Sequence, residues 1–123
     1  MLVLRALCGF AAYDIVIAVR GFQTMYSIVR NWKVSSSKPP SPETVSRVCA
    51  AINHASIWYP KRVLCLQRSF ATTYILRKSG VPAQMVFGAR KVPFKAHAWV
   101  EIDGQPVNER SNVFGTYAVL ERC

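Results

Sequence analysis

The distribution of apolar and polar residues along the chain predicts helices in its first two thirds and strands in its last third. After Cys65, apolar residues recur at helical spacing, and this helix is expected to end before Gly80. Residues 96–102 instead alternate between apolar and polar side chains, which is typical of a strand. Asp103 and Gly104 follow and form a strong hairpin-turn signal. Further strands are expected at residues 83–90, 105–109 and 117–120.

The first 32 residues are predicted to form one apolar helix. Apolar residues occur around most of its circumference, and the apolar runs are interrupted by four charged residues, Arg5, Asp14, Arg20 and Arg30. These runs are far shorter than a bilayer span requires, so a helix that packs on the domain is favoured. The alternative is a helix that docks onto a partner enzyme or onto the inner membrane surface. No signal peptide is expected, because the first eight residues lack a charged n-region and a small-residue cleavage site.

A Ser/Pro-rich linker at residues 35–42 separates this N-terminal helix, residues 1–34, from the remainder, residues 43–123. Ser41 and Pro42 predict the start of the next helix, as its cap and its first residue. The expected buried stripe of that helix consists of Val45, Val48, Cys49, Ile52 and Ala55. The whole pattern predicts an α+β fold, with N-terminal helices followed by a small antiparallel sheet packed on the cysteine helix.

Cys65 is expected in or near the first turn of its helix. Free backbone N–H groups and the positive end of the helix dipole favour thiolate over thiol there, and the thiolate is the nucleophile. Taken alone, Cys65 is equally well interpreted as a small buried residue that fills the core. His97, on a later strand, adds to the catalytic interpretation, because papain-like and transglutaminase-like folds build a nucleophile and its base in this way. The other histidine, His54, lies in an apolar helical segment and is interpreted as structural.

A third group would orient the imidazole of His97. Glu109 is preferred because it lies on the expected return strand, and Asn108 is the neutral alternative. Asp103 is expected at the hairpin tip, where it would point to water. Glu101 shares a strand face with His97 and is expected to be a solvated strand residue.

Composition narrows the possible chemistry. The chain has 16 Lys and Arg residues against 6 Asp and Glu residues, and the net charge of +10 suits nucleic acid, an anionic membrane or an acidic peptide. The basic residues are scattered and no nucleic-acid motif is present, so nucleic acid is not expected as a partner. The wide spacing of the four cysteines (8, 49, 65 and 123) argues against a zinc site and for reduced thiols. No glycine-rich phosphate loop is present, so the chain is expected to use neither ATP nor another cofactor.

Several motifs around these residues resemble the B-protein family of lasso-peptide biosynthesis, the transglutaminase-like leader peptidases. They are Cys65-Leu66-Gln67-Arg68-Ser69 with Ala71, the helix exit at residues 76–83, the strand Val86-Phe87-Gly88-Ala89-Arg90, and Ala96-His97-Ala98-Trp99-Val100-Glu101 with Gly104. The resemblance covers about residues 40–123. It implies a papain/transglutaminase-type fold and a Cys-His-Asp triad, whose first two members fall on Cys65 and His97. Glu109 follows Val107-Asn108 at the position where the family commonly has aspartate.

The resemblance also implies a function and partners. A cysteine protease of this family removes the leader from a ribosomally made precursor peptide during lasso-peptide maturation. The implied partners are that precursor, a small leader-recognition protein supplied in trans, and an ATP-dependent macrolactam synthetase. The chain would work in the cytoplasm or at the periphery of the inner membrane. Two alternatives use the same fold: an acyl transferase, in which an amine resolves the intermediate, and a non-catalytic scaffold that binds the precursor.

Overall fold

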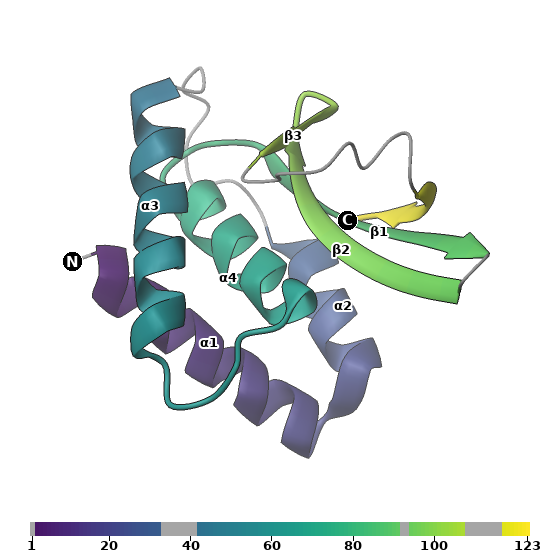
Figure 1. The fold of residues 1–123 in the computed structure, drawn as a ribbon, viewed down its shortest axis with the longest axis horizontal. Coiled ribbons are helices and arrows are strands. Elements are labelled where there is room, and N and C mark those ends of the chain that lie inside the picture. The colour runs from purple at the N-terminus through teal and green to yellow at the C-terminus, as the bar shows by residue number, and fades with distance from the viewer. Residues whose placement is uncertain (1, 33–41, 92–93, 108–116) are drawn as a thin grey trace.

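The structure is a computed structural model that describes residues 2–32, 42–91, 94–107 and 117–123. Four helices precede four strands in the described chain (Figure 1): α1 (Leu2–Val19), α2 (Gly21–Asn31), α3 (Pro42–Trp58), α4 (Cys65–Lys78), β1 (Ala83–Lys91), β2 (Phe94–Ile102), β3 (Gln105–Val107) and β4 (Ala118–Arg122). The predicted α+β class is confirmed, as are the helix start at Pro42 and the helix over Cys65–Lys78. Residues 35–41 of the predicted linker lie outside the described residues.

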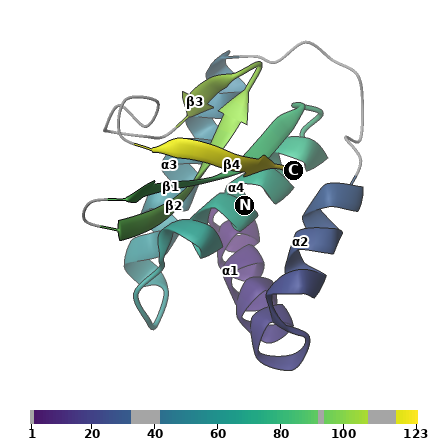
Figure 2. The same ribbon diagram turned by 90° about the vertical axis from the view of Figure 1, so that its right-hand side faces the viewer.

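The prediction of one helix over residues 1–32 is wrong, because this segment forms α1 and α2. Between them lies Arg20, which is not part of either helix, and Gly21 has a φ of +81°. Glycine adopts this left-handed conformation without the steric cost that other residues meet, so the chain turns here. Figure 2 shows the result, with α2 lying beside α1.

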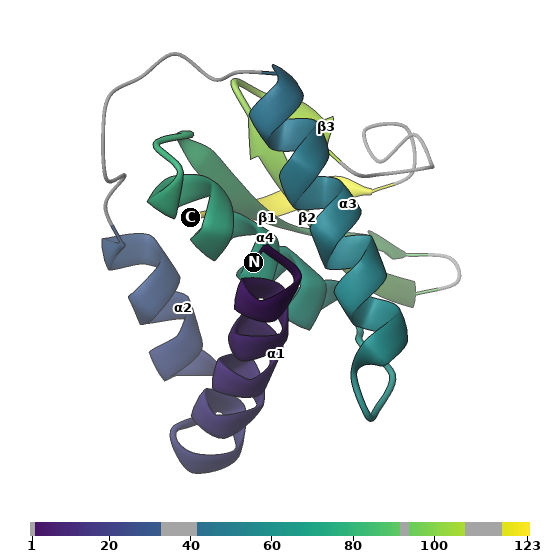
Figure 3. The same ribbon diagram turned by 90° about the vertical axis from the view of Figure 1, so that its left-hand side faces the viewer.

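α4 is the central helix of the fold, and nine of its 14 residues are buried. It packs against α1, α3, β1 and β2, and the view in Figure 3 shows the helical side of the molecule with the sheet behind it. A Cβ atom on Gly9 would lie 3.1 Å from the Cβ of Ala71, so α1 and α4 approach each other closely. The side-chain amide of Gln67 also donates a hydrogen bond of 2.8 Å to the carbonyl of Phe10. These contacts hold the helix that begins at Cys65 firmly against α1.

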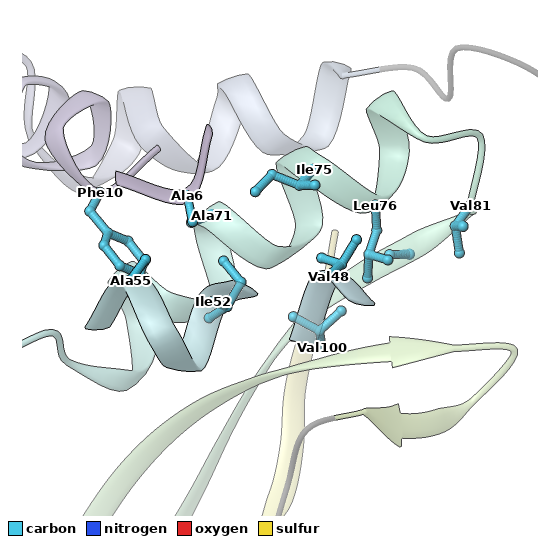
Figure 4. Close-up of a cluster of buried hydrophobic side chains, with 11 residues drawn as sticks. Ala6, Phe10, Val48, Ile52, Ala55, Ala71, Ile75, Leu76, Val81 and Val100 are labelled. Carbon is cyan, nitrogen blue, oxygen red and sulfur yellow. The ribbon is translucent and has the colours of Figure 1, made fainter. Parts of the chain in front are cut away.

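The main core lies where α1, α3 and α4 meet the sheet (Figure 4). Its buried side chains include Phe10, Val48, Ile52, Ala71, Ile75, Leu76 and Val100. Burial of each large apolar side chain contributes about 1.5–3 kcal/mol to stability. The predicted stripe of α3 is confirmed for Val48, Ile52 and Ala55, which are fully buried.

The strands form one antiparallel sheet in the order β3-β2-β1-β4. β1 and β2 pair along their whole length, and Gly88 lies opposite His97. β3 pairs with β2 only at Val100, Glu101 and Ile102. Asp103 and Gly104 have φ values of 51° and 77°, as the predicted hairpin turn requires. The strand predicted over residues 105–109 is observed for Gln105–Val107, and residues 108–109 lie outside the described chain.

The alternation along β2 separates two kinds of side chain. Val100 belongs to the core that the helices form, whereas Trp99 packs with Val86 and Tyr117 in a separate cluster. His97 and Glu101 are on the same pleat as Trp99. The predicted alternation of this strand is therefore confirmed, but both of its faces carry buried residues.

Arg77, near the end of α4, ties several distant segments together. Its Nε donates to the carbonyl of Ala83 at 2.8 Å, and its Nη2 donates to the carbonyl of Cys123 at 2.6 Å. Its Nη1 donates to the carbonyls of Val29 and Trp32, the latter at 3.0 Å. One buried guanidinium thus fastens the end of α2 and the end of the chain to α4 and β1.

By length and composition, α1 could cross a membrane, since its 18 residues have a mean hydropathy of 2.0. The uninterrupted apolar runs of α1 are short, whereas this criterion averages over the whole helix with Arg5 and Asp14 included; the core helix of a soluble protein can meet it as well. Ala6, Gly9 and Phe10 nevertheless bury one side of α1 in the fold. Because α1 contributes Phe10 to the core, this helix is an integral part of the domain.

Candidate active site

Cys65 is the first residue of α4, as the sequence predicts. Leu64 precedes it in an extended conformation, and the amide of Arg68 donates the first helical hydrogen bond, of 2.9 Å, to the Leu64 carbonyl. Among the described residues no side chain caps this end of α4. The first-turn amides of a helix have no partner within the helix. They therefore place backbone donors beside the sulfur of Cys65, where an oxyanion could be stabilised.

The loop before Cys65 is anchored to α1. The hydroxyl of Tyr59 donates a hydrogen bond to the carboxylate of Asp14, and the Lys61 ammonium lies 2.7 Å from the same carboxylate. Burial raises the pKa of Asp14, but these hydrogen bonds outweigh it and the net pKa is below the usual value. Burial, followed by the hydrogen bond to Asp14, raises the pKa of Tyr59 to about 12. The loop that leads into the candidate nucleophile is thus held by a charged pair and a tyrosine.

His97 lies on β2 within a group of three aromatic rings. Its ring centroid is 5.8 Å from that of Trp99 and 5.3 Å from that of Tyr117, and both pairs are stacked. The Trp99 ring also covers Gly88, where an added Cβ would lie only 2.6 Å from it. Any larger residue at this position of β1 would displace the indole that supports the imidazole.

Glu101 is fully buried, so the prediction that it is a solvated strand residue is wrong. Its carboxylate accepts a hydrogen bond of 2.9 Å from the Trp99 indole N–H and one of 3.1 Å from Arg122 Nε. The indole and the guanidinium satisfy the buried charge, which strand alternation alone does not reveal. Glu101 is therefore the partner of Trp99, the ring that stacks on His97.

Cys65 and His97 line the same two hollows of the described structure. The first, named here the apolar hollow, has a volume of about 650 Å³ and is lined by Phe22, Tyr26, Leu66, Phe87 and Leu120 together with the two candidate residues. The second, named here the polar hollow because polar side chains make up more of its lining, has a volume of about 550 Å³. It is lined by Asn53, Ser56, Arg68, Ser69 and Thr72, and also by the apolar side chains of Ile57, Val63, Trp99, Val100 and Val107. Cys65, His97 and Ala98 are common to both linings. The cysteine and the histidine therefore lie at the junction of two hollows of different chemistry.

The third predicted member of the site, Glu109, and its neutral alternative, Asn108, lie outside the described residues. Asp103 is exposed in the hairpin turn, as predicted. It follows the last residue of β2, Ile102, and is separated from His97 by the end of that strand. The described residues thus bring together two of the three predicted catalytic groups, and Glu109 stays a prediction.

The other candidate residues have no place in this arrangement. His54 is exposed on α3, so the prediction that it has a structural role finds no support in its packing. Burial raises the pKa of the Cys49 thiol, and it raises that of Cys123 to about 11, which disfavours the reactive thiolate at both positions. Cys8 is exposed on α1. In the described part of the chain, no three His, Cys, Asp or Glu side chains are grouped closely enough to hold a metal ion.

The aromatic residues of α2 were not predicted as part of the site. Phe22 and Tyr26 lie one turn apart and both contact Phe87 of β1, with ring centroids 5.7 and 5.9 Å away. The sequence does contain a signal for them, because apolar residues recur at Phe22, Tyr26 and Val29 after Gly21. This spacing indicates a separate amphipathic helix, which is hidden when residues 1–32 are considered as one continuous apolar segment.

Comparison with known proteins agrees with the observed fold. The family model of the transglutaminase-like superfamily matches residues 9–122, so the chain belongs to the transglutaminase-like superfamily. The match includes α2 and α4 as well as the sheet, and the predicted papain/transglutaminase-like fold is confirmed.

The chain is also similar to a protein of known role. Over 56 residues, 46% of this chain, it is 38% identical to the microcin J25-processing protein McjB of Escherichia coli. The matched stretch spans 27% of McjB, so about a quarter of that relative is represented. The resemblance to the B-protein family of lasso-peptide biosynthesis is confirmed over the parts that these two matches cover. No solved structure matches the chain.

Proposed function

We propose that this chain is a cysteine peptidase that removes the leader from a ribosomally made precursor peptide during lasso-peptide maturation. The observation that carries the proposal is the placement of Cys65, at the start of α4, in the same two hollows as His97. Membership of the transglutaminase-like superfamily and the similarity to a microcin-processing protein support it. A hollow on either side of the cysteine gives an extended peptide room to lie across the sulfur.

The proposed reaction has two steps. His97 accepts the thiol proton of Cys65, the sulfur attacks the scissile carbonyl carbon, and the C–N bond breaks as His97 gives that proton to the departing amine. His97 next takes a proton from water, the hydroxide attacks the thioester, and the released sulfur regains the proton from His97. The oxyanion of each tetrahedral intermediate would be bound by the Cys65 amide and a neighbouring first-turn amide. Glu109 is proposed to hold the imidazole, as the resemblance implies.

The proposed partners follow from the resemblance to the B-protein family. We propose that a leader-recognition protein delivers the precursor, as that resemblance implies. A macrolactam synthetase would act on the product. We place the reaction in the cytoplasm, where thiols stay reduced, or at the periphery of the inner membrane.

The test is to incubate a lasso precursor peptide with the purified protein and the leader-recognition protein, and to measure the masses of the products by mass spectrometry. Hydrolysis predicts two peptides, free leader and free core, whose masses sum to that of the precursor plus one water. A product in which the acyl part is joined to an amine would show an acyl transferase instead. Intact precursor that remains bound to the protein would contradict the peptidase and favour the non-catalytic scaffold.

A further inference from the structure

We infer that the apolar hollow is a subsite that receives one large apolar or aromatic side chain of the peptide substrate, next to the bond that Cys65 attacks. This inference rests on the proposed function, because it describes the substrate of the same site. It assigns a role to α2 that neither the family match nor the similarity to McjB provides.

The walls of the apolar hollow are aromatic and aliphatic. Phe22 and Tyr26 of α2 face Phe87 of β1 in a cluster of three rings, whose centroids are 5.7–6.3 Å apart. Leu66 follows the nucleophile directly, and Leu120 completes the lining from β4. An apolar side chain placed here would exchange water for ring and methylene contacts on several sides.

Two of the side chains that line the apolar hollow are not fully buried within the fold. Phe22 remains 44% exposed and Leu120 67% exposed, so both retain apolar surface for another group to cover. Polar groups occur at one part of the lining, where a hydrogen bond with Glu121 raises the pKa of Tyr26 and Arg30 lies near its ring. They leave an apolar space that is large enough for a side chain such as leucine or phenylalanine and whose chemistry suits it.

The polar hollow on the other side of Cys65 provides the contrast. Arg68 there donates a hydrogen bond to Asn53, and Ser69 and Thr72 continue the lining along α4. A peptide that crosses the sulfur therefore meets a mainly apolar lining on one side and a lining of mixed polar and apolar side chains, with Arg68, on the other. This asymmetry would fix which side of the scissile bond carries the apolar residue.

The experiment compares two reagents that alkylate thiols by displacement of iodide, iodoacetamide and N-benzyliodoacetamide. The benzyl group can rotate to either side of the sulfur, so the comparison does not depend on the direction in which a peptide binds. Each rate is measured for Cys65 by peptide mass spectrometry, with glutathione in the same reaction as the reference thiol. The inference predicts that the benzyl group accelerates alkylation of Cys65 roughly tenfold more than that of glutathione.

Two variants assign the effect to the hollow. Phe22→Ser removes one aromatic wall at a partly exposed position and should abolish most of the benzyl acceleration. Ile15→Ser removes an apolar side chain that is 63% exposed on α1, away from both hollows, and should leave the acceleration unchanged. The inference is overturned if the benzyl group gives no advantage at Cys65, or if both variants behave like the wild type.

The same data separate this inference from the proposed function. If iodoacetamide itself alkylates Cys65 faster than the exposed Cys8 while the benzyl group has no effect, the reactive cysteine stands and the subsite does not. If Cys65 reacts no faster than Cys8 with iodoacetamide, the nucleophile of the proposed function is contradicted, whatever the benzyl group does.

Discussion

The indole N–H of Trp99 donates a hydrogen bond of 2.9 Å to the buried carboxylate of Glu101, two residues further along β2. The same indole stacks on the ring of His97. Arg122 lies on β4, and its Nε is 3.1 Å from the carboxylate of Glu101. The ring that supports the candidate base is thus held by a buried acid, and the acid is held by an arginine on the edge strand.

Replacement of Glu101 by leucine should therefore destabilise the fold. It would leave the Trp99 N–H without its acceptor and Arg122 without its partner, and the free energy of unfolding should fall by about 2–4 kcal/mol. Glu101→Gln keeps an acceptor for the indole and should cost less. Urea denaturation measures the free energy of unfolding of both variants.

Glu43→Gln, which alters an exposed pair with Arg47, is the control and should change stability by less than about 0.5 kcal/mol. A leucine variant as stable as the wild type would contradict this role.

Arg77 provides a second test of how the fold is held. Arg77→Met removes the guanidinium donor from four backbone carbonyls, those of Val29, Trp32, Ala83 and Cys123. The Val29 carbonyl still accepts from the Trp32 amide, whose hydrogen bond is 3.3 Å long. The free energy of unfolding should fall by about 2–4 kcal/mol. Lys78→Met changes the exposed neighbouring residue and should have little effect in the same urea titration. Equal stability of the two variants would mean that the arginine is dispensable to the fold.

The sequence predicts α4 and the position of Cys65 at its start well, because the signals involved are local. Helical spacing after Cys65 and the stop at Gly80 define the helix, and Asp103-Gly104 defines the hairpin. Cys65 and His97 could be chosen as partners from the motifs around them, and the structure places both at the same hollows.

Features that depend on tertiary contacts were missed. Strand alternation treats Glu101 as a surface residue, and only the positions of Trp99 and Arg122 explain why a charge is buried there. The break at Gly21 was hidden because apolar residues surround both N-terminal helices. Because that break was not predicted, the aromatic residues that α2 contributes to the site were not predicted either.

The charged pair that anchors the loop before Cys65 should make stability depend on pH. The pKa of Asp14 is lowered in the folded chain, so its contribution is fully present above the ordinary value of 3.8 and is lost as pH falls through the folded pKa. Asp14→Asn should therefore lower the melting temperature at pH 7, by about 2–4 °C.

This difference between wild type and Asp14→Asn should shrink as the pH is lowered toward 3. Differential scanning fluorimetry at pH 7, 5 and 3 measures it. A difference that is the same at all three values would show that the Asp14 charge does not hold the loop. The exposed Asp103, replaced by asparagine, serves as the control and should show no such trend.

The most direct test of the central claim is the rate of precursor cleavage by the wild type, by Cys65→Ala and by Cys8→Ala, each with the leader-recognition protein present. Cys65→Ala should lose roughly a thousand-fold or more of the activity while it keeps the melting temperature of the wild type within a few degrees. Cys8→Ala, which changes an exposed thiol on α1, should cleave at the wild-type rate. Cleavage by Cys65→Ala at the wild-type rate would contradict the assignment of Cys65 as the nucleophile.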